Sequence, residues 1–416
     1  MASRLLARGT AVLAAGALVW AVAAPAASAD EIRDKQWALK IFEAETKVWP
    51  VSQGEGVVVA VIDSGVNSEH QDLTGQVLPG ADFSGAKSDG RTDTDGHGTG
   101  MASLIAGHGH GAQAGVMGLA PKAKILPVKV RTSNGDPMPE QNDLAAAIRF
   151  AVDHGATVIN MSIGGPFHYD SQVRKAVAYA VSKDAVLVGG AGNSGADLSV
   201  NYPAAFPGVV AVGAADAKGV VWDSSKPGPE LTLLAPGVEV YHASAKSLTS
   251  YAIGNGTSDS TAYVSATAAL IRSKYPNLSA GQVINRMIKS ATPPPDGTVV
   301  PNVHYGYGVL APAKALEPNP TVDNGPKENP LANRPESLGT PPSDDDSDAT
   351  DQPSAVPGAA SGGGGGDGTG LVIGAGAAGV VVVGVSVAAV VVARRRRRRV
   401  AEGLYPPQPP YGGAGH

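Results

Sequence analysis

The sequence has no cysteine among its 416 residues. This absence excludes disulfide bonds, a thiol nucleophile and any metal site ligated by cysteine. The stability of the folded protein must therefore come from its core rather than from covalent crosslinks. Apolar residues make up 43% of the chain, which is enough to bury a large core.

A strong net charge is also missing. The formal charge of −5 at pH 7 indicates no general affinity for nucleic acid, and we expect none among the partners. We expect no cofactor and no metal. His108 and His110 could be metal ligands, but flanking glycines and the lack of a third nearby ligand favour a flexible surface loop. A structural calcium ion bound by backbone carbonyls stays open.

The first 29 residues have the pattern of a signal peptide. Arg4 and Arg8 precede an apolar stretch over 11–24, and Ala-Ser-Ala at 27–29 predicts cleavage before Asp30. An uncleaved anchor helix is the alternative. Export places the globular part of the chain outside the cytoplasm.

Three motifs carry candidate chemistry. The apolar run at 57–65 predicts a strand buried on both faces, with Asp63 at its carboxyl end. His97 lies between two glycines at the start of a small-residue helix, and a glycine turn within 254–272 presents Ser258 at the start of another. Alone, each motif also fits a turn, a structural histidine or a helix cap. Together they supply an orienting carboxylate, a base and a nucleophile.

These motifs resemble the signatures of subtilisin-like serine proteases, peptidase family S8. The matches are Val-Ile-Asp-Ser-Gly at 61–65, His-Gly-Thr at 97–99 and Gly-Thr-Ser at 256–258, with Ala-Gly-Asn at 191–193 as a fourth. The resemblance covers roughly residues 36–316. It implies a three-layer α/β fold with a mostly parallel sheet and helices on both faces.

The resemblance also implies a role for each site residue. Ser258 would attack a peptide carbonyl, His97 would take and return the proton, and Asp63 would orient His97. Asn193 would donate its side-chain amide to the developing oxyanion. One departure is Ala262, where the family usually has proline, and we expect only local rigidity to change.

The chain leaves no room for the long inhibitory propeptide of secreted subtilisins, because fewer than thirty residues separate Asp30 from the first predicted strand. In this respect it resembles the mycosins, membrane-bound subtilisin-like proteases of type VII secretion systems. Their short N-terminal extension wraps the catalytic domain. The extension includes Trp37, Ile41, Phe42 and Trp49. We therefore expect residues 30–50 to pack on the catalytic domain, residues 51–316, through the aromatic side chains among these.

Alternating strand and helix patterns predict βαβ units. The segment 160–165 resembles the one that lines the substrate cleft in this family, where a peptide could add as a strand. Strands are predicted at 125–130, 157–161, 185–190, 209–212 and 231–234, and helices at 143–154, 171–183 and 279–290.

The C-terminal part predicts a membrane anchor. Residues 317–370 are rich in proline, aspartate, serine and glycine, which predicts a disordered linker. The 23 uncharged residues 371–393 are long enough to span a bilayer. Six arginines at 394–399 place the tail, residues 394–416, in the cytoplasm. Small residues in the predicted span hint at membrane proteins of a secretion complex as partners.

Two functions remain in view. The leading hypothesis is a membrane-tethered serine endopeptidase of the mycosin type, acting on peptide or protein substrates. The alternative is a structural clamp of a membrane secretion complex in which proteolysis is dispensable. An esterase is disfavoured because no Gly-x-Ser-x-Gly motif surrounds Ser258. We expect activity to fall when His97 is protonated at mildly acidic pH.

Overall fold

The computed structural model describes residues 31–335, apart from 112, 131–143, 166 and 196–198. The predicted signal peptide, the predicted membrane span at 371–393 and the basic tail lie outside the described residues. Within the described part, no helix is long and apolar enough to cross a membrane.

A seven-stranded sheet forms the middle of the domain, in the order β2-β5-β1-β6-β7-β8-β9. Every pair of neighbouring strands in it is parallel, as the βαβ pattern predicts. Chain order reverses at β1, which has β5 on one side and β6 on the other, and such a switch point is where α/β folds place their sites. The strands are β1 (Val58–Asp63), β2 (Ala81–Asp82), β5 (Lys124–Lys129), β6 (Val158–Met161), β7 (Val186–Gly190), β8 (Val209–Ala215) and β9 (Leu231–Pro236).

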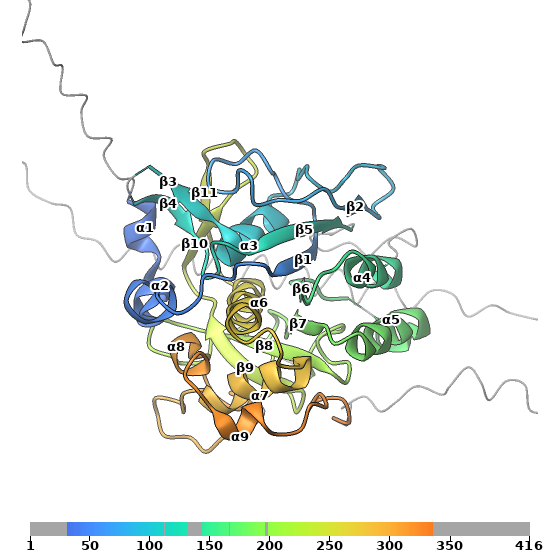
Figure 1. Cartoon of the computed structure of the whole chain (residues 1–416), viewed down its shortest axis with the longest axis vertical. Coiled ribbons are helices and arrows are strands. Elements are labelled where there is room, and N and C mark those ends of the chain that lie inside the picture. The colour runs from blue at the N-terminus through green and yellow to red at the C-terminus, as the bar shows by residue number, and fades with distance from the viewer. Residues whose placement is uncertain (1–30, 112, 131–143, 166, 196–198, 336–416) are drawn as a thin grey trace, which may run out of the picture. The chain divides into compact units, whose positions relative to one another are not determined.

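Helices cover both faces of this sheet (Figure 1). Alternate residues of β1 point to opposite faces, so Val59 and Val61 join one apolar cluster while Ala60 and Ile62 join the other. The first cluster includes residues of α3 (His97–Ala106), α6 (Thr257–Lys274) and α7 (Ala280–Ser290). The second includes residues of α4 (Leu144–Asp153) and α5 (Ser171–Ser182). The predicted three-layer fold is confirmed.

Helix α6 runs through the centre of one layer. From Thr257 to Ile271 every residue except Ser258 is buried. Alanine, serine and threonine predominate there, and their small side chains let the helix lie close against β6, β7 and β8. Because its buried surface surrounds the helix, no amphipathic stripe is visible in its sequence.

Two small antiparallel hairpins complete the fold: β3 (His108–His110) with β4 (Ala114–Met117), and β10 (Val240–Ala243) with β11 (Tyr251–Gly254). The prediction of a flexible loop at His108 and His110 is wrong. His110 Nδ1 lies 2.7 Å from Oδ1 of the buried Asp72, whose Oδ2 accepts the Val116 N–H at 2.8 Å. The carboxylate of Asp72 therefore holds both sides of the first hairpin.

The N-terminal extension folds onto the domain as α1 (Ile32–Lys35), α2 (Trp37–Ile41) and a π-helical turn (Ala44–Val48). Phe42 is buried and meets Tyr263 of α6 edge to face at 5.5 Å. Trp49 donates its indole N–H to Leu119 O at 3.0 Å. The predicted packing through the aromatic side chains is confirmed, whereas Ile41 beside them is 48% exposed.

The globular domain continues past residue 316. Helices α8 (Pro312–Ala315) and α9 (Pro320–Asp323) pack near α7, and the Arg286 guanidinium pairs with Asp323 at 2.6 Å. Arg334 donates to the Phe206 carbonyl at 2.9 Å. The predicted start of the linker at residue 317 is therefore wrong. Two arginines bind this polar segment to the domain, which its composition alone does not reveal.

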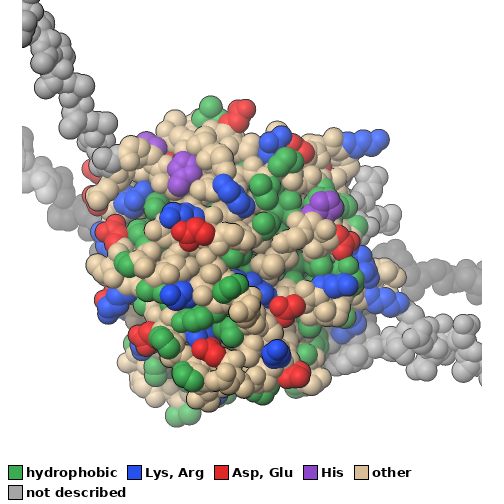
Figure 2. All heavy atoms as spheres, viewed as in Figure 1, with side chains coloured by type: hydrophobic (Ala, Val, Ile, Leu, Met, Phe, Trp, Pro, Cys, Tyr) green, Lys and Arg blue, Asp and Glu red, His purple; other side chains and the backbone are tan. Residues whose placement is uncertain are grey.

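The surface carries charges of both signs. On the face seen in Figure 2, acidic and basic side chains are interspersed with small apolar areas, and no large area of one sign stands out.

Candidate active site

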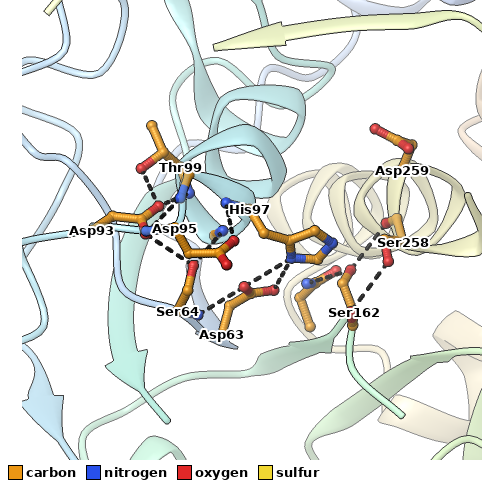
Figure 3. A network of polar contacts seen from close by, with 12 residues as sticks. Asp63, Ser64, Asp93, Asp95, His97, Thr99, Ser162, Ser258 and Asp259 are labelled. Atoms are coloured by element: carbon orange, nitrogen blue, oxygen red, sulfur yellow. Dashed lines mark hydrogen bonds and ion pairs between the residues drawn. The ribbon is translucent and has the colours of Figure 1, made fainter. Parts of the chain in front are cut away.

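The carboxylate of Asp63 holds the imidazole of His97 (Figure 3). Asp63 is the last residue of β1 and is fully buried, and His97 begins α3. His97 Nδ1 lies 2.8 Å from Oδ1 and 2.9 Å from Oδ2 of Asp63. Since an ionised carboxylate only accepts, Nδ1 carries a proton, and Nε2 of neutral His97 is left with a lone pair.

The close approach of His97 to Asp63 requires a glycine at position 98. A Cβ added there would lie 2.1 Å from the Gly65 carbonyl oxygen and 3.1 Å from the Asp63 Cβ. Gly65 itself has a φ of 100°, which other residues rarely adopt. The two glycines thus let the start of α3 lie against the end of β1.

Asp93 fixes the start of α3, a role that the motifs did not indicate. Its Oδ2 accepts from the N–H and the hydroxyl of Thr99 at 3.0 and 2.6 Å. Its Oδ1 accepts from the Ser64 hydroxyl at 3.0 Å, and that hydroxyl accepts the Gly98 N–H at 2.9 Å. A buried carboxylate therefore joins the end of β1 to the first turn of the helix that carries His97.

Ser258 lies in the first turn of α6, but its hydroxyl points to another partner. It donates to the carbonyl oxygen of Ser162 at 3.2 Å. No hydrogen bond among the described residues joins Ser258 to His97. The structure thus brings Asp63 and His97 together, and the link from Ser258 to Nε2 of His97 requires the hydroxyl to rotate.

Asn193 stands at the other side of the serine turn. Its Oδ1 accepts from the Thr257 N–H at 2.9 Å and from the Thr257 hydroxyl at 3.0 Å. These two donors identify the oxygen of the amide, so the NH₂ group is directed elsewhere. That NH₂ has no hydrogen-bond partner within the described part of the chain, and Asn193 is exposed. The amide is therefore fixed by one end and able to donate from the other.

The segment after β6, which resembles a cleft lining, is bonded to α6. Asn160 Nδ2 donates to the Ser162 hydroxyl at 3.0 Å, and this hydroxyl donates to the Ser258 carbonyl at 3.0 Å. The Ser265 hydroxyl also donates to Oδ1 of Asn160, at 3.0 Å. This buried row of hydrogen bonds sets the position of the first turn of α6 relative to the sheet.

The electrostatics of the site favour a charged His97. Burial acts against the imidazolium, but the charge and hydrogen bond of Asp63 outweigh it, with smaller contributions from Asp259 and Asp95. The pKa of His97 rises to about 9 as a result. Within the described residues, no group of three acidic or histidine side chains could hold a metal ion.

The comparisons with known proteins agree with this geometry. A model of the subtilase family, Peptidase_S8, matches residues 54–308. Subtilisin DY of Bacillus licheniformis is 39% identical over 261 residues, which are 62% of this chain and 90% of that protein. Subtilisin E of Bacillus subtilis is 38% identical over 260 residues, which are 65% of its length.

Solved structures similar to this one include two proteins of type VII secretion. MycP1 from Mycobacterium smegmatis has a TM-score of 0.61 at 29% identity, over 71% of this chain and 87% of that one. The MycP3 protease from the type VII (ESX-3) secretion system has a TM-score of 0.58 at 31% identity, over 68% and 87%. With the family model covering most of the chain, this protein belongs to the subtilase family and is a subtilisin-like serine endopeptidase.

Proposed function

We propose that this subtilase is a membrane-anchored, extracytoplasmic endopeptidase of the mycosin type that hydrolyses peptide bonds through Asp63, His97 and Ser258, with Asn193 as an oxyanion donor. The observation that carries the catalytic part is the short contact between His97 Nδ1 and the buried Asp63 carboxylate. It fixes the tautomer in which Nε2 is the base.

The reaction follows from these positions. The Ser258 hydroxyl turns from the Ser162 carbonyl to Nε2 of His97 and attacks the substrate carbonyl as His97 takes its proton. The imidazolium, stabilised by Asp63, then gives this proton to the leaving amine. Water, deprotonated by His97 in the same way, next cleaves the acyl group from Ser258 and restores its hydroxyl. The oxyanion that forms in between accepts hydrogen bonds from the Asn193 NH₂ and the Ser258 N–H. The Ser258 N–H is available because it has no intrahelical partner in the first turn of α6.

Three observations support the mycosin assignment. Solved mycosins are among the similar structures. The short extension before β1 is folded onto the catalytic domain through Phe42 and Trp49. Residues 371–393 are uncharged and, as a helix rising about 1.5 Å per residue, would exceed the roughly 30 Å apolar thickness of a bilayer. The arginines at 394–399 would keep the tail in the cytoplasm.

A serine-directed fluorophosphonate tests the catalytic part. The full chain in detergent should be labelled, and the Ser258→Ala variant should not be. Ser182→Ala, which removes an exposed hydroxyl at the end of α5, is the matched control and should label like the unaltered chain. Equal labelling of the Ser258→Ala protein would refute the nucleophile.

The anchor and the possible clamp role need separate experiments. In cells, the protein should fractionate with membranes, and removal of residues 371–416 should release its catalytic domain. Secretion in a strain carrying Ser258→Ala is then compared with secretion in a full deletion strain. Loss of export in the deletion strain alone would assign the secretion role to the folded domain and not to proteolysis.

A further inference from the structure

The proposed reaction determines where the substrate residue before the scissile bond lies. Its carbonyl carbon meets the Ser258 hydroxyl, which donates to the Ser162 carbonyl at 3.2 Å (Figure 3). Its carbonyl oxygen points to the NH₂ of Asn193. The residue is therefore enclosed between the segment that follows β6, residues 162–165, and the segment that follows β7, residues 191–193. Its side chain then enters the space between these two segments, which we call the slot.

The side chain of Asn201 already lies in the slot. A Cβ added to Gly164 would be 2.8 Å from Asn201 Nδ2, and one added to Gly192 would be 2.6 Å from the same atom. The amide thus lies on the side-chain side of both backbones. Gly164 does not have a positive φ, so its backbone conformation does not require glycine. The close approach of Asn201 explains why this position carries no side chain.

The backbone around Asn201 closes the inner end of the slot. The Asn201 N–H donates to the Ala191 carbonyl at 2.9 Å, and the Gly165 N–H donates to the Tyr202 carbonyl at 3.0 Å. One residue is therefore bonded to one wall of the slot and its neighbour to the other wall. The position from which the Asn201 side chain starts is fixed by the same hydrogen bonds that hold the two walls together.

The Asn201 side chain is packed along its length but its amide is open to a ligand. The Asn201 Cβ and Cγ would lie 3.3 and 3.4 Å from a Cβ at Gly164, so the whole side chain follows this wall. Among the described residues the amide has no hydrogen-bond partner, and Asn201 is partly exposed. A substrate side chain that enters the slot therefore meets this amide.

We propose that Asn201 is a specificity-determining residue: it shortens the slot, so that the substrate residue before the scissile bond is a small one such as alanine, serine or glycine. This inference rests on the proposed roles of Ser258 and Asn193. A phenylalanine or leucine side chain in the slot would need the volume that the Asn201 side chain occupies. A small side chain leaves the amide in place, and a serine hydroxyl there can also form a hydrogen bond with it.

Two substrates that differ only in the residue before the scissile bond measure this preference. They are tetrapeptide p-nitroanilides that end in alanine or in phenylalanine, cleaved by the full chain in detergent. The unaltered chain should have the higher kcat/KM for the alanine substrate. In Asn201→Ala, which clears the slot, the kcat/KM for phenylalanine relative to alanine should rise by about tenfold to a hundredfold. A smaller amount of folded enzyme, or slower chemistry common to both substrates, leaves this ratio unchanged.

Three variants accompany this measurement. Asn201→Asp keeps the volume of the side chain and should keep the preference for alanine. Asn277→Ala removes an exposed asparagine just beyond the last turn of α6, at the opposite end of this helix from Ser258, and should leave the ratio unchanged. If Asn201→Ala does not fold, Asn201→Ser decides, because it also shortens the side chain.

If the unaltered chain cleaves neither p-nitroanilide, the cuts that it makes in denatured casein decide. Mapped by mass spectrometry, they should follow small residues in the unaltered chain and extend to large apolar residues in Asn201→Ala. Three results would overturn the proposal: equal cleavage after phenylalanine and alanine by the unaltered chain, an unchanged preference in folded Asn201→Ala, or an equal change in Asn201→Asp. Failure of the proposed function looks different, because the unaltered chain would then not be labelled by the fluorophosphonate or Ser258→Ala would be labelled equally.

Discussion

Ser258 and Ser162 are bonded reciprocally: each hydroxyl donates to the backbone carbonyl of the other, at 3.2 and 3.0 Å. The two residues come from different parts of the fold, one at the start of α6 and one just after β6. The Ser258 hydroxyl therefore has a partner in the segment that follows β6. In the proposed reaction it leaves this carbonyl and turns to His97.

Ser162→Ala should destabilise the fold. The substitution leaves Nδ2 of the fully buried Asn160 without its acceptor, which costs about 1 to 3 kcal/mol of unfolding free energy. Urea unfolding of the full chain in detergent gives the difference. Ser182→Ala is the control, since its hydroxyl bonds only within the exposed end of α5, and it should change stability by about 0.5 kcal/mol or less. Equal stability of both variants would contradict the prediction.

Asn193→Ala should lower turnover by about a hundredfold to a thousandfold, the loss known for an oxyanion donor in subtilisin itself, with little change in KM. Hydrolysis of denatured casein is a suitable measurement. Thr257→Val is the matched control, because it removes one hydrogen bond to Oδ1 of Asn193 and keeps its NH₂. A greater loss in Thr257→Val than in Asn193→Ala would show that the turn matters more than the donor.

The pH dependence should follow His97. Its imidazolium cannot accept the Ser258 proton, so inactivation by a fluorophosphonate should be slow at low pH and rise as the pH passes through about 9. The inactivation rate should therefore rise at a higher pH than the mildly acidic range expected for a histidine of ordinary pKa. Asp63→Asn should move the midpoint down, because the anion that stabilises the imidazolium is lost. A midpoint near 6.5, the ordinary pKa of histidine, would contradict the role of Asp63.

Phe42→Ala should cost about 3 to 5 kcal/mol of unfolding free energy, because it removes a buried ring that packs on Tyr263 of α6. Ile41→Ala is a matched control from the next position, where the side chain is 48% exposed, and should change stability by about 0.5 kcal/mol or less. Chemical unfolding of the two variants provides the comparison. Similar values would show that the extension contributes little to the stability of the domain.

The sheet and the site motifs were predictable because their signals are local. An apolar run such as residues 57–62 is typical of a strand that is buried on both faces, and Asp63 then lies at the carboxyl end of this strand. Gly98 beside His97 is needed for a close approach, and the sequence shows it directly. The orientation of the Ser258 hydroxyl was not predictable, because its partner, Ser162, is far away in the chain.

Other features depend on partners that no short pattern reveals. The hairpin at His108–His110 forms around Asp72, and the segment after residue 316 is bound through Arg286 and Asp323.

Helix α6 presents the candidate nucleophile and is also the centre of one layer of the core, buried over nearly all of its length. The turn that holds Ser258 is therefore in place only when this layer has packed. A chain that is still folding does not yet present the hydroxyl on which the proposed reaction depends.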